Sequence, residues 1–325
     1  MLEKIVFLFY YSVMKQYDME NFRRLKLSWK RDANHKERQE YKMKDYFGYE
    51  GKICVVTGAS SGMGKATADM LVDLGAKVYA IARRKCEVDG LACSIQADLS
   101  KREEIDSAFG QIPEHIDCFF GVAGLSGSKS DDMTTFNVNY TANRYITENY
   151  LKTRMHEGGS ILFVTSTSGV AWHENFREAE KILGMGDWQE VQEGMAKVVQ
   201  PETPAQVAYL LSKRAANAYA CSLAVELGER GIRVNAIMPG STDTGMRDEF
   251  AMMAGGLENM IRFAGKAGRL ATSEEVAMPI VFLNSDMAGF ISGEELIVDY
   301  CDNAMKKMNL KPEICGAPAL PEEVL

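Results

Sequence analysis

Short apolar segments alternate with helical stretches along most of the chain, and this alternation limits the possible folds more than any other feature. The apolar segments are residues 53–57, 77–82, 93–98, 116–124, 160–169, 232–240 and 294–300. The clearest helical stretches between them are 101–110, 133–156, 205–228 and 273–284. Strands that alternate with helices and are mostly apolar throughout are typical of a parallel sheet covered on both faces. The pattern predicts an α/β fold built on one doubly wound parallel sheet.

The alternation occupies residues 49–310, which we interpret as a single domain because no repeat or low-complexity linker divides them. Residues 1–48 are a predicted N-terminal extension, densely charged with mixed sign. Its apolar stretch, 5–11, is too short to span a bilayer and lacks the flanks of a signal peptide. We expect a solvated extension without stable membrane insertion; a membrane-surface or partner-binding helix is the alternative. Residues 311–325 form a predicted C-terminal tail.

Charge and cysteine content exclude several classes of function. The net charge of −8 leaves no excess of basic side chains to neutralise phosphates, so we expect no nucleic-acid partner. The seven cysteines are scattered and form no C-x-x-C pair, which argues against a zinc site and a disulfide framework. We therefore expect no metal, reduced thiols and a cytoplasmic location.

A glycine-rich turn, "TGASSGMG" at residues 57–64, joins the first apolar segment to the helix after it. Glycines at such a turn let backbone amides approach a pyrophosphate at the N-terminus of the helix. Its place between strand and helix favours a Rossmann-type dinucleotide site over an ordinary loop. The predicted cofactor-binding residues of this turn are Gly58, Ser60, Ser61, Gly62, Met63 and Gly64.

The end of the second apolar segment indicates which dinucleotide is used. Sites that select NAD usually carry an acidic residue there to hold the ribose 2′-hydroxyl. This chain has Ala82 followed by Arg83 and Arg84. No carboxylate repels a 2′-phosphate, and a guanidinium can pair with one. We therefore expect NADP(H) to be favoured over NAD(H); two solvated arginines are the alternative.

Tyr209 and Lys213 stand four residues apart in a helical stretch, and therefore on one face of a helix. A phenol with an ordinary pKa of about 10 is a poor acid or base at neutral pH. A neighbouring ammonium favours the phenolate and lowers that pKa. Tyr209 could then exchange a proton with an alcohol or with the alkoxide formed from a ketone.

Seven motifs occur in the order found in short-chain dehydrogenase/reductases, and over about residues 50–304 the chain resembles that family. The motifs are "TGASSGMG", "AD" at 97–98, "VAG" at 122–124, "VNY" at 138–140, "TSTSG" at 165–169, "YLLSK" at 209–213 and "PGSTDT" at 239–244. The resemblance implies a nicotinamide-dependent oxidoreductase that interconverts an alcohol and a carbonyl compound. It also implies a homo-oligomer.

The resemblance assigns roles to individual residues. Ser166 matches the serine that hydrogen-bonds the substrate oxygen, with Thr165 and Ser168 as alternatives. Tyr209 matches the acid–base residue, and Lys213 the lysine that tunes it and holds the nicotinamide ribose. Asn139 matches the asparagine that kinks a helix and positions a water in a proton relay. Besides the glycine turn, Arg83, Arg84, Tyr209 and Lys213, the predicted cofactor-binding residues are Asp98, Leu99, Ala123, Gly124, Pro239, Gly240, Thr242 and Thr244.

The chain departs from the family pattern in two short motifs. The usual N-A-G reads Val122-Ala123-Gly124, so the asparagine that supports the strand is missing. The usual V-D-G-G reads Val298-Asp299-Tyr300-Cys301, which we expect to alter packing near the C-terminal edge of the sheet.

A long insert is the third departure. Ser166 and Tyr209 are 43 positions apart, much farther than in typical members, and the extra residues fall at about 171–205. The stretch between Gly124 and Asn139 is, in contrast, unusually short. This combination resembles a subgroup of hydroxysteroid dehydrogenase/carbonyl reductases, including bacterial 3α-hydroxysteroid enzymes. We expect the insert to be helical; it could cover the substrate or alter a subunit interface.

Apolar side chains near the predicted site suggest the substrate. Residues 245–264 hold Met246, Phe250, Met252, Met253, Met260 and Phe263, and Leu125, Trp172 and Trp188 could extend this apolar wall. Core packing of the methionines is the alternative. We predict a small apolar alcohol or carbonyl substrate, a hydroxysteroid or bile acid above all. A 3-oxoacyl thioester or other small-carbonyl reductase is the alternative enzyme, and a cofactor-sensing regulator is the non-enzyme alternative.

Overall fold

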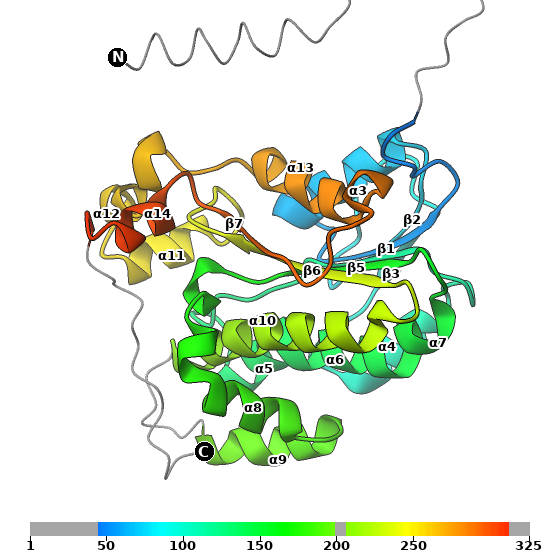
Figure 1. Cartoon of the computed structure of the whole chain (residues 1–325), viewed down its shortest axis with the longest axis horizontal. Helices are drawn as coiled ribbons and strands as arrows, with labels where there is room; N and C mark the ends of the chain where they lie inside the picture. Colours follow the sequence, from blue (N-terminus) through cyan, green and yellow to red (C-terminus); the bar gives the residue numbers. More distant parts are fainter. Residues whose placement is uncertain (1–44, 199–205, 312–325) are drawn as a thin grey trace, which may run out of the picture. The chain divides into compact units, whose positions relative to one another are not determined.

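The computed structural model describes residues 45–198 and 206–311. Its centre is a seven-stranded parallel sheet with strand order β3-β2-β1-β4-β5-β6-β7 (Figure 1). The strands are β1 (Ile53–Thr57), β2 (Lys77–Ala82), β3 (Cys93–Gln96), β4 (Cys118–Gly121), β5 (Ser160–Val164), β6 (Arg233–Pro239) and β7 (Glu295–Val298). The predicted Rossmann-type doubly wound sheet is therefore confirmed, with every apolar segment contributing one strand.

Helices cover both faces of the sheet (Figure 1). One face carries α3 (Gly62–Asp73) and α13 (Ser273–Asn284), and the other carries α4 (Arg102–Phe109), α10 (Val207–Gly228) and the helical segment 132–154. Alternate strand residues enter two separate cores, because successive side chains of a strand point to opposite faces. In β4, Phe119 belongs to the core beneath α10 and Phe120 to the core beneath α3 and α13.

The predicted helix 133–156 is helical but irregular. It consists of α5 (Asp132–Phe136), a π-helical turn at Asn137–Thr141, α6 (Ala142–Ile146), a second π-helical turn at Thr147–Leu151 and α7 (Lys152–Arg154). The first π turn holds Asn139 at its centre. Single π turns often occur at functional sites.

The described part of the insert is helical, as predicted. A 3₁₀ turn (Trp172–Asn175) leads into α8 (Phe176–Gly184) and α9 (Trp188–Val198), which lie against α10 and α5 on the side away from the sheet (Figure 1). Ile182 of α8 and Val191 of α9 extend the core beneath α10. Residues 199–205 lie outside the described residues. The insert therefore adds a layer outside the helices that carry the predicted catalytic side chains.

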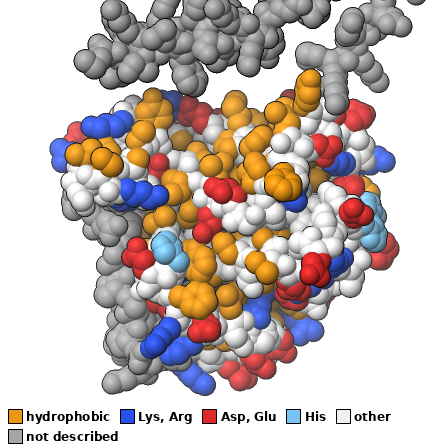
Figure 2. Space-filling model, in the orientation of Figure 1, with side chains coloured by type: hydrophobic (Ala, Val, Ile, Leu, Met, Phe, Trp, Pro, Cys, Tyr) orange, Lys and Arg blue, Asp and Glu red, His pale blue; other side chains and the backbone are white. Residues whose placement is uncertain are grey.

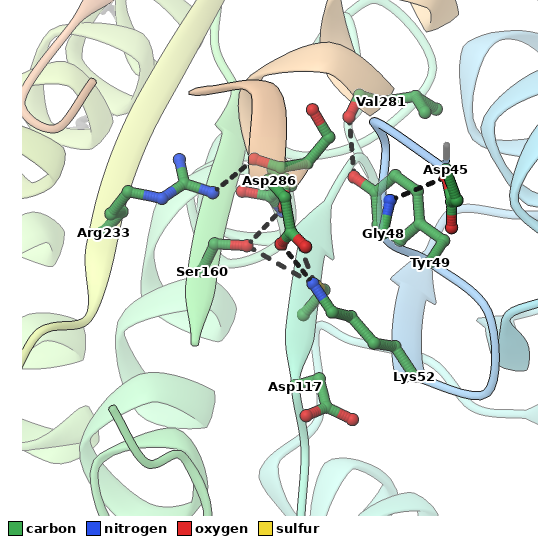
Figure 3. Close-up of polar contacts among 12 residues, drawn as sticks. Asp45, Gly48, Tyr49, Lys52, Asp117, Ser160, Arg233, Val281 and Asp286 are labelled. Carbon is green, nitrogen blue, oxygen red and sulfur yellow. Dashed lines mark hydrogen bonds and ion pairs between the residues drawn. The ribbon is translucent and has the colours of Figure 1, made fainter. Parts of the chain in front are cut away.

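The compact unit begins at Asp45, a few residues before the predicted start at 49. The Tyr49 hydroxyl donates a hydrogen bond of 2.6 Å to the carbonyl oxygen of Val281, and the Lys52 ammonium lies 2.6 Å from the Asp286 carboxylate (Figure 3). The Asp286 amide donates to the carbonyl oxygen of Phe47 at 3.0 Å. This cluster ties the beginning of the domain to α13 and the turn after it. Residues 1–44, which hold most of the predicted extension, and 312–325 of the tail lie outside the described residues.

Short helices follow the carboxyl ends of the last two strands. They are α11 (Arg247–Met253) and α12 (Leu257–Arg262) after β6, and α14 (Asp302–Lys307) after β7. Between β7 and α14, Tyr300 and Cys301 have φ angles of 44° and 77°, where the family pattern has glycines. Left-handed backbone disfavours residues with a Cβ, so Tyr300 and Cys301 carry local backbone strain. No helix of the described residues is both long and apolar enough to cross a membrane.

Candidate active site

A cavity of about 770 Å³ lies at the carboxyl ends of the central strands. Ligands of open α/β sheets bind at this edge, in the crevice where the strand order reverses. Thirteen of the predicted site residues line the cavity: Gly58, Ser60, Ser61, Gly62, Met63, Gly64, Arg83, Arg84, Asp98, Leu99, Ala123, Gly124 and Thr244. One cavity thus joins the glycine turn, the arginines after β2 and the ends of β3 and β4.

The glycine turn has the close backbone contacts that a phosphate cradle requires. Gly58 has a φ of 72°, and a Cβ there would lie 2.8 Å from the Cα of Ala123. A Cβ at Gly64 would lie 2.4 Å from the carbonyl oxygen of Gly58. The turn opens into α3, a helix of 12 residues whose N-cap, Ser61, makes no side-chain capping bond. The first amides of α3 are therefore available to an anion, and the turn fits a dinucleotide pyrophosphate.

The far end of the cavity carries the arginines that follow β2. Ala82 is buried, whereas Arg83 and Arg84 are exposed and line the cavity. The Arg84 guanidinium donates to the Ser61 hydroxyl at 3.1 Å, which holds it beside the glycine turn. Asp98 is fixed by Ser100, whose amide and hydroxyl both donate to its carboxylate at 3.0 and 2.8 Å.

Thr57 supports the end of β4, where this chain has Val122 in place of the family asparagine. Its hydroxyl oxygen accepts hydrogen bonds from the amides of Val122 and Ala123 at 3.0 and 3.1 Å. The substitution in the N-A-G motif therefore leaves both amides satisfied.

Tyr209 and Lys213 lie one turn apart on α10, as the spacing predicts. The Lys213 ammonium is 5.6 Å from the centre of the Tyr209 ring and donates to the carbonyl oxygen of Val164, at the end of β5, at 3.2 Å. Burial lowers the pKa of Lys213 to about 8. The pair thus has the arrangement that the spacing predicts, with the ammonium of Lys213 beside the ring of Tyr209.

Asn139 joins this pair to the loop after β4. Its side-chain oxygen accepts from the Leu125 amide at 2.8 Å, and its nitrogen donates to the Leu125 carbonyl at 3.0 Å and to the Ser212 hydroxyl at 3.1 Å. A Cβ at Gly124 would lie 3.3 Å from the Asn139 side-chain oxygen and 3.7 Å from the Lys213 ammonium. The structure therefore brings Asn139, Gly124 and Lys213 together.

Ser166 is the second residue after the end of β5 and caps a 3₁₀ turn, Thr167–Gly169. Its hydroxyl oxygen accepts from the Ser168 amide at 3.1 Å and still has a proton to donate. Thr165, one of the two alternatives, instead donates to the carbonyl oxygen of Ile237 within the sheet. Gly169 packs against the backbone of Lys213, where a Cβ would lie 2.8 Å away. The Ser166 turn thus rests directly on α10.

The predicted residues after β6 divide into two groups. Thr244 lines the cavity and faces Gly62, where a Cβ would lie 3.4 Å from the Thr244 side chain. Pro239, Gly240 and Thr242 are not among the residues that line it. Thr242 forms a bridge with Ala271, and its hydroxyl donates to the carbonyl oxygen of Gly240 at 3.0 Å.

The four predicted catalytic residues are likewise not among the residues that line the cavity: Asn139, Ser166, Tyr209 and Lys213.

The predicted apolar wall is only partly present at the site. Leu125 and Met246 line the cavity, and the ring of Phe250 meets the ring of Tyr209 edge-on at 5.7 Å. Met260 is buried, whereas Met252 and Leu257 reach the surface near α11 and α12, where Figure 2 shows apolar side chains among charged ones.

Neither tryptophan of the insert lines the cavity, which corrects that part of the prediction. The Trp172 indole donates to the Glu295 carboxylate of β7 at 2.8 Å. Trp188 packs edge-on against Tyr145 of α6 at 5.6 Å. Both rings therefore fasten the insert to the domain.

Several residues that line the cavity were not predicted. They are Ala97, Val122, Ser126, Lys129, Ser130, Val138, Gly245 and Glu249, besides Ala82. Residues 126–130 follow the end of β4, and the rule that ligands bind at carboxyl ends of parallel strands could have identified them. Glu249 carries no such signal, because it lies within a charged stretch of a late helix.

The fold and this cavity define a dinucleotide-binding enzyme. The residues present fit a nicotinamide dinucleotide: the glycine turn would hold its pyrophosphate, and the residues after β2 and β3 its adenosine. When bound, such a cofactor supplies or accepts a hydride. Tyr209 would exchange the proton at the substrate oxygen, with Ser166 donating a hydrogen bond to that oxygen.

Comparisons with known proteins agree with this class. The family model described as short chain dehydrogenase matches residues 52–176, and one described as enoyl-(acyl carrier protein) reductase matches residues 195–300. A coniferyl-alcohol dehydrogenase from Pseudomonas sp. (strain HR199 / DSM 7063) is 34% identical over 76% of this chain and 95% of its own. A 2,3-dihydro-2,3-dihydroxybenzoate dehydrogenase from Escherichia coli (strain K12) is 27% identical over 77% and 96%.

Solved structures show the same fold. A 3-alpha-hydroxysteroid dehydrogenase from Pseudomonas sp. B-0831, complexed with NADH, has a TM-score of 0.65 at 23% identity and covers 80% of this chain and 99% of its own. The chain belongs to the short-chain dehydrogenase/reductase family. It is accordingly an oxidoreductase of alcohol and carbonyl substrates that uses a nicotinamide cofactor.

Proposed function

We propose that this enzyme interconverts an apolar, ring-bearing alcohol and the matching carbonyl compound with NADP(H) as cofactor. The observation that carries the proposal is the edge-on contact of Phe250 with Tyr209 at 5.7 Å. The aromatic ring of Phe250 therefore lies beside Tyr209, the residue that would exchange a proton with the substrate oxygen. An apolar ring gains more from burial against such a surface than a polar sugar does, because it buries more apolar area.

Retention of the full catalytic set supports an enzyme rather than a cofactor-sensing regulator on the same fold. Asn139 donates to the Ser212 hydroxyl, which donates to the carbonyl oxygen of Tyr209 at 2.7 Å. The Lys213 ammonium lies over the Tyr209 ring, and the Ser166 turn packs on the same helix. A regulator would be expected to lose part of this set.

Two classes of ring-bearing substrate are candidates. Hydroxysteroids and bile acids follow from the resemblance to the hydroxysteroid dehydrogenase subgroup, although Trp172 and Trp188 lie away from the cavity. Aryl-substituted primary alcohols follow from the relative at 34% identity, which is a coniferyl-alcohol dehydrogenase. A flat aryl group needs less apolar wall than a steroid, and the apolar side chains near the site include Leu125 and Met246 at the cavity and Phe250 beside Tyr209.

The substrate class can be tested by comparing kcat/KM for a hydroxysteroid, a bile acid, coniferyl alcohol, a 3-oxoacyl thioester and a small aliphatic ketone. We expect a ring-bearing substrate to be used best, and Phe250→Ala to lower its kcat/KM about tenfold or more while changing that of the small ketone little. Met252→Ala, an exposed position of the same helix, is the control. Equal kcat/KM values for the ring-bearing and small substrates in the wild type would exclude the proposal.

The preference for NADP(H) rests on Arg83 and Arg84 at the cavity and on the missing carboxylate at Ala82. A charge-assisted pair of a guanidinium with a phosphate contributes about 1.5–3 kcal/mol, or about a factor of 10 to 150 in affinity. We therefore expect NADPH to bind more tightly than NADH, and Ala82→Asp combined with Arg83→Ala to reverse the order. Tighter binding of NADH by the wild type would show that the arginines do not select the cofactor.

A further inference from the structure

Two chain segments far apart in sequence meet in the wall of the cofactor cavity. One is the loop 125–130 after β4, and the other is α11 after β6. The Glu249 carboxylate of α11 accepts hydrogen bonds from the hydroxyls of Ser126 and of Ser128, the latter at 2.9 Å, and lies 3.0 Å from the Lys129 ammonium. Three donors of one loop thus converge on one carboxylate.

The loop is shaped for this convergence. Gly127 has a φ of 87°, a backbone conformation that favours glycine, and it turns the chain between the two serines. The hydroxyls of Ser126 and Ser128 are consequently 3.1 Å apart. The Glu249 side chain is only 13% exposed, whereas that of the neighbouring Asp248 is 83% exposed.

The carboxylate is held in its ionised form. Burial raises the pKa of Glu249, but hydrogen bonds from Ser126, Lys129 and Ser128 outweigh burial and keep the pKa below its ordinary value. Because a charged acceptor strengthens each bond, the three contacts form a firm connection at neutral pH. We call Ser126, Ser128, Lys129 and Glu249 the clasp.

The residues next to the clasp in sequence, Leu125 and Phe250, contact the predicted catalytic residues Asn139 and Tyr209. On the loop side, Leu125 precedes Ser126 and is held by two hydrogen bonds to Asn139. On the helix side, Phe250 follows Glu249 and contacts the Tyr209 ring. The clasp therefore connects the loop beside Asn139 to the aromatic surface beside Tyr209.

We propose that Glu249 is a positioning residue whose carboxylate clasps the loop 125–130 to α11 across the wall of the cofactor cavity, so that the clasp must open for a nicotinamide dinucleotide to leave. The inference rests on the use of this cavity for the cofactor, as in the proposed function. Ser126, Lys129 and Glu249 line the same cavity as Gly58, Gly62 and Gly64. The loop 125–130 and α11 are joined here by side-chain bonds, so they can separate without loss of the sheet. The glycine turn of the same cavity joins β1 to α3 and cannot move away in this manner.

Loss of the clasp has two consequences. The cofactor leaves faster, because loop and helix separate more easily. The KM of a ring-bearing substrate rises, because Phe250 loses the connection that fixes α11 against Tyr209. Both follow from a single change at Glu249, whose carboxylate is bonded to Ser126, Ser128 and Lys129.

The test measures release of NADPH and of NADH by stopped-flow fluorescence, with excess oxidised cofactor as the displacing ligand. We expect Glu249→Gln to accelerate release about tenfold or more, the effect of losing a charge-assisted hydrogen bond. Asp248→Asn, the adjacent exposed carboxylate, should release cofactor at the wild-type rate. In a double-mutant cycle, Ser126→Ala should have a smaller effect in Glu249→Gln than in the wild type, because the neutral amide has already lost the charge-assisted part of the same contact.

Release from Glu249→Gln at the wild-type rate would overturn the proposal, as would full additivity of Ser126→Ala with it. Should Glu249→Gln fail to fold, Ser126→Ala with Ser128→Ala removes two donors and leaves the carboxylate, and the same acceleration is expected. Failure of the proposed function would be visible elsewhere, in the substrate comparison and in the relative affinities of NADPH and NADH for the wild type.

Discussion

Lys213 combines two properties at the scale of a single residue. It is buried, which lowers its pKa to about 8, and it lies beside the ring of Tyr209. Below about pH 8 the folded protein holds a buried charge, and this burial costs stability. Between pH 8 and the ordinary pKa of 10.5 the unfolded chain binds a proton that the folded protein has released, so this cost declines as the pH rises. At neutral pH the ammonium form predominates, as the pairing with Tyr209 requires.

Tyr209→Phe tests the acid–base assignment most directly. The variant keeps the ring that packs against Phe250 and removes only the hydroxyl, so we expect it to fold and to bind cofactor normally. Its kcat should fall about 10²–10⁴-fold, the usual contribution of general acid–base catalysis. Steady-state kinetics and cofactor fluorescence measure both properties. Retention of more than a tenth of the wild-type kcat would assign the proton transfer to another group.

Residues recognisable from sequence were those whose chemistry is set by local spacing. The glycine turn and the pair Tyr209 and Lys213 are fixed by strand–turn–helix order and by the helical repeat. Glu249 could not be recognised, because its partners Ser126 and Ser128 stand more than 120 positions earlier in the chain. Only the fold brings these groups together.

At the scale of elements, the strands and long helices were predictable because apolar periodicity determines them. Their ends were not: the segment 160–169 leaves the sheet after Val164, where Ser166 caps a 3₁₀ turn. Apolar periodicity does not indicate the π turn around Asn139; only the family resemblance implies a kink there. The bonds of the Asn139 side chain to the backbone of Leu125 come from another segment and need the fold. The prediction that Trp172 and Trp188 lie near the substrate is wrong. The composition of an insert does not show which of its side chains pack against the domain and which face the site.

The insert is fastened to α10 by a buried ion pair, Glu178 with Arg214, whose charged atoms are 3.1 Å apart. Arg214 is adjacent to Lys213 in sequence, so the pair joins the insert to the helix that carries the catalytic side chains. Glu178→Ala leaves the guanidinium without the carboxylate opposite it, and we expect the free energy of unfolding to fall by about 3–5 kcal/mol. Chemical denaturation measures the loss.

Glu180→Ala is the matched control, since Glu180 lies on the same helix and is exposed. A surface substitution of this kind should change stability by no more than about 0.5 kcal/mol. Replacement of both partners, with Glu178→Leu and Arg214→Met, should recover much of the lost stability. Equal stability of Glu178→Ala and Glu180→Ala would show that the ion pair does not hold the insert.

At the scale of the whole molecule, the domain needs the residues from Phe47 onward. Removal of residues 1–44 leaves the contacts of Tyr49 and Lys52 intact, and we expect kcat/KM within a few-fold of the full chain. Removal of residues 1–49 deletes Tyr49, whose buried ring packs near Phe120, and should lower Tm clearly. Activity and thermal unfolding of the two truncations distinguish these outcomes. A large loss of activity on removing 1–44 would place the extension in the site or in a subunit interface.

The cluster around Tyr49 also has a consequence for synthesis of the chain. Tyr49 and Lys52 find their partners Val281 and Asp286 232 and 234 residues later. At translation rates of about 5–20 residues per second, roughly 10–50 s pass before those partners have been made. During this interval the part of the sheet that α13 later covers stays open to solvent. This face of the sheet can therefore be covered only after α13 has left the ribosome, so the strands made first wait longest for their final contacts.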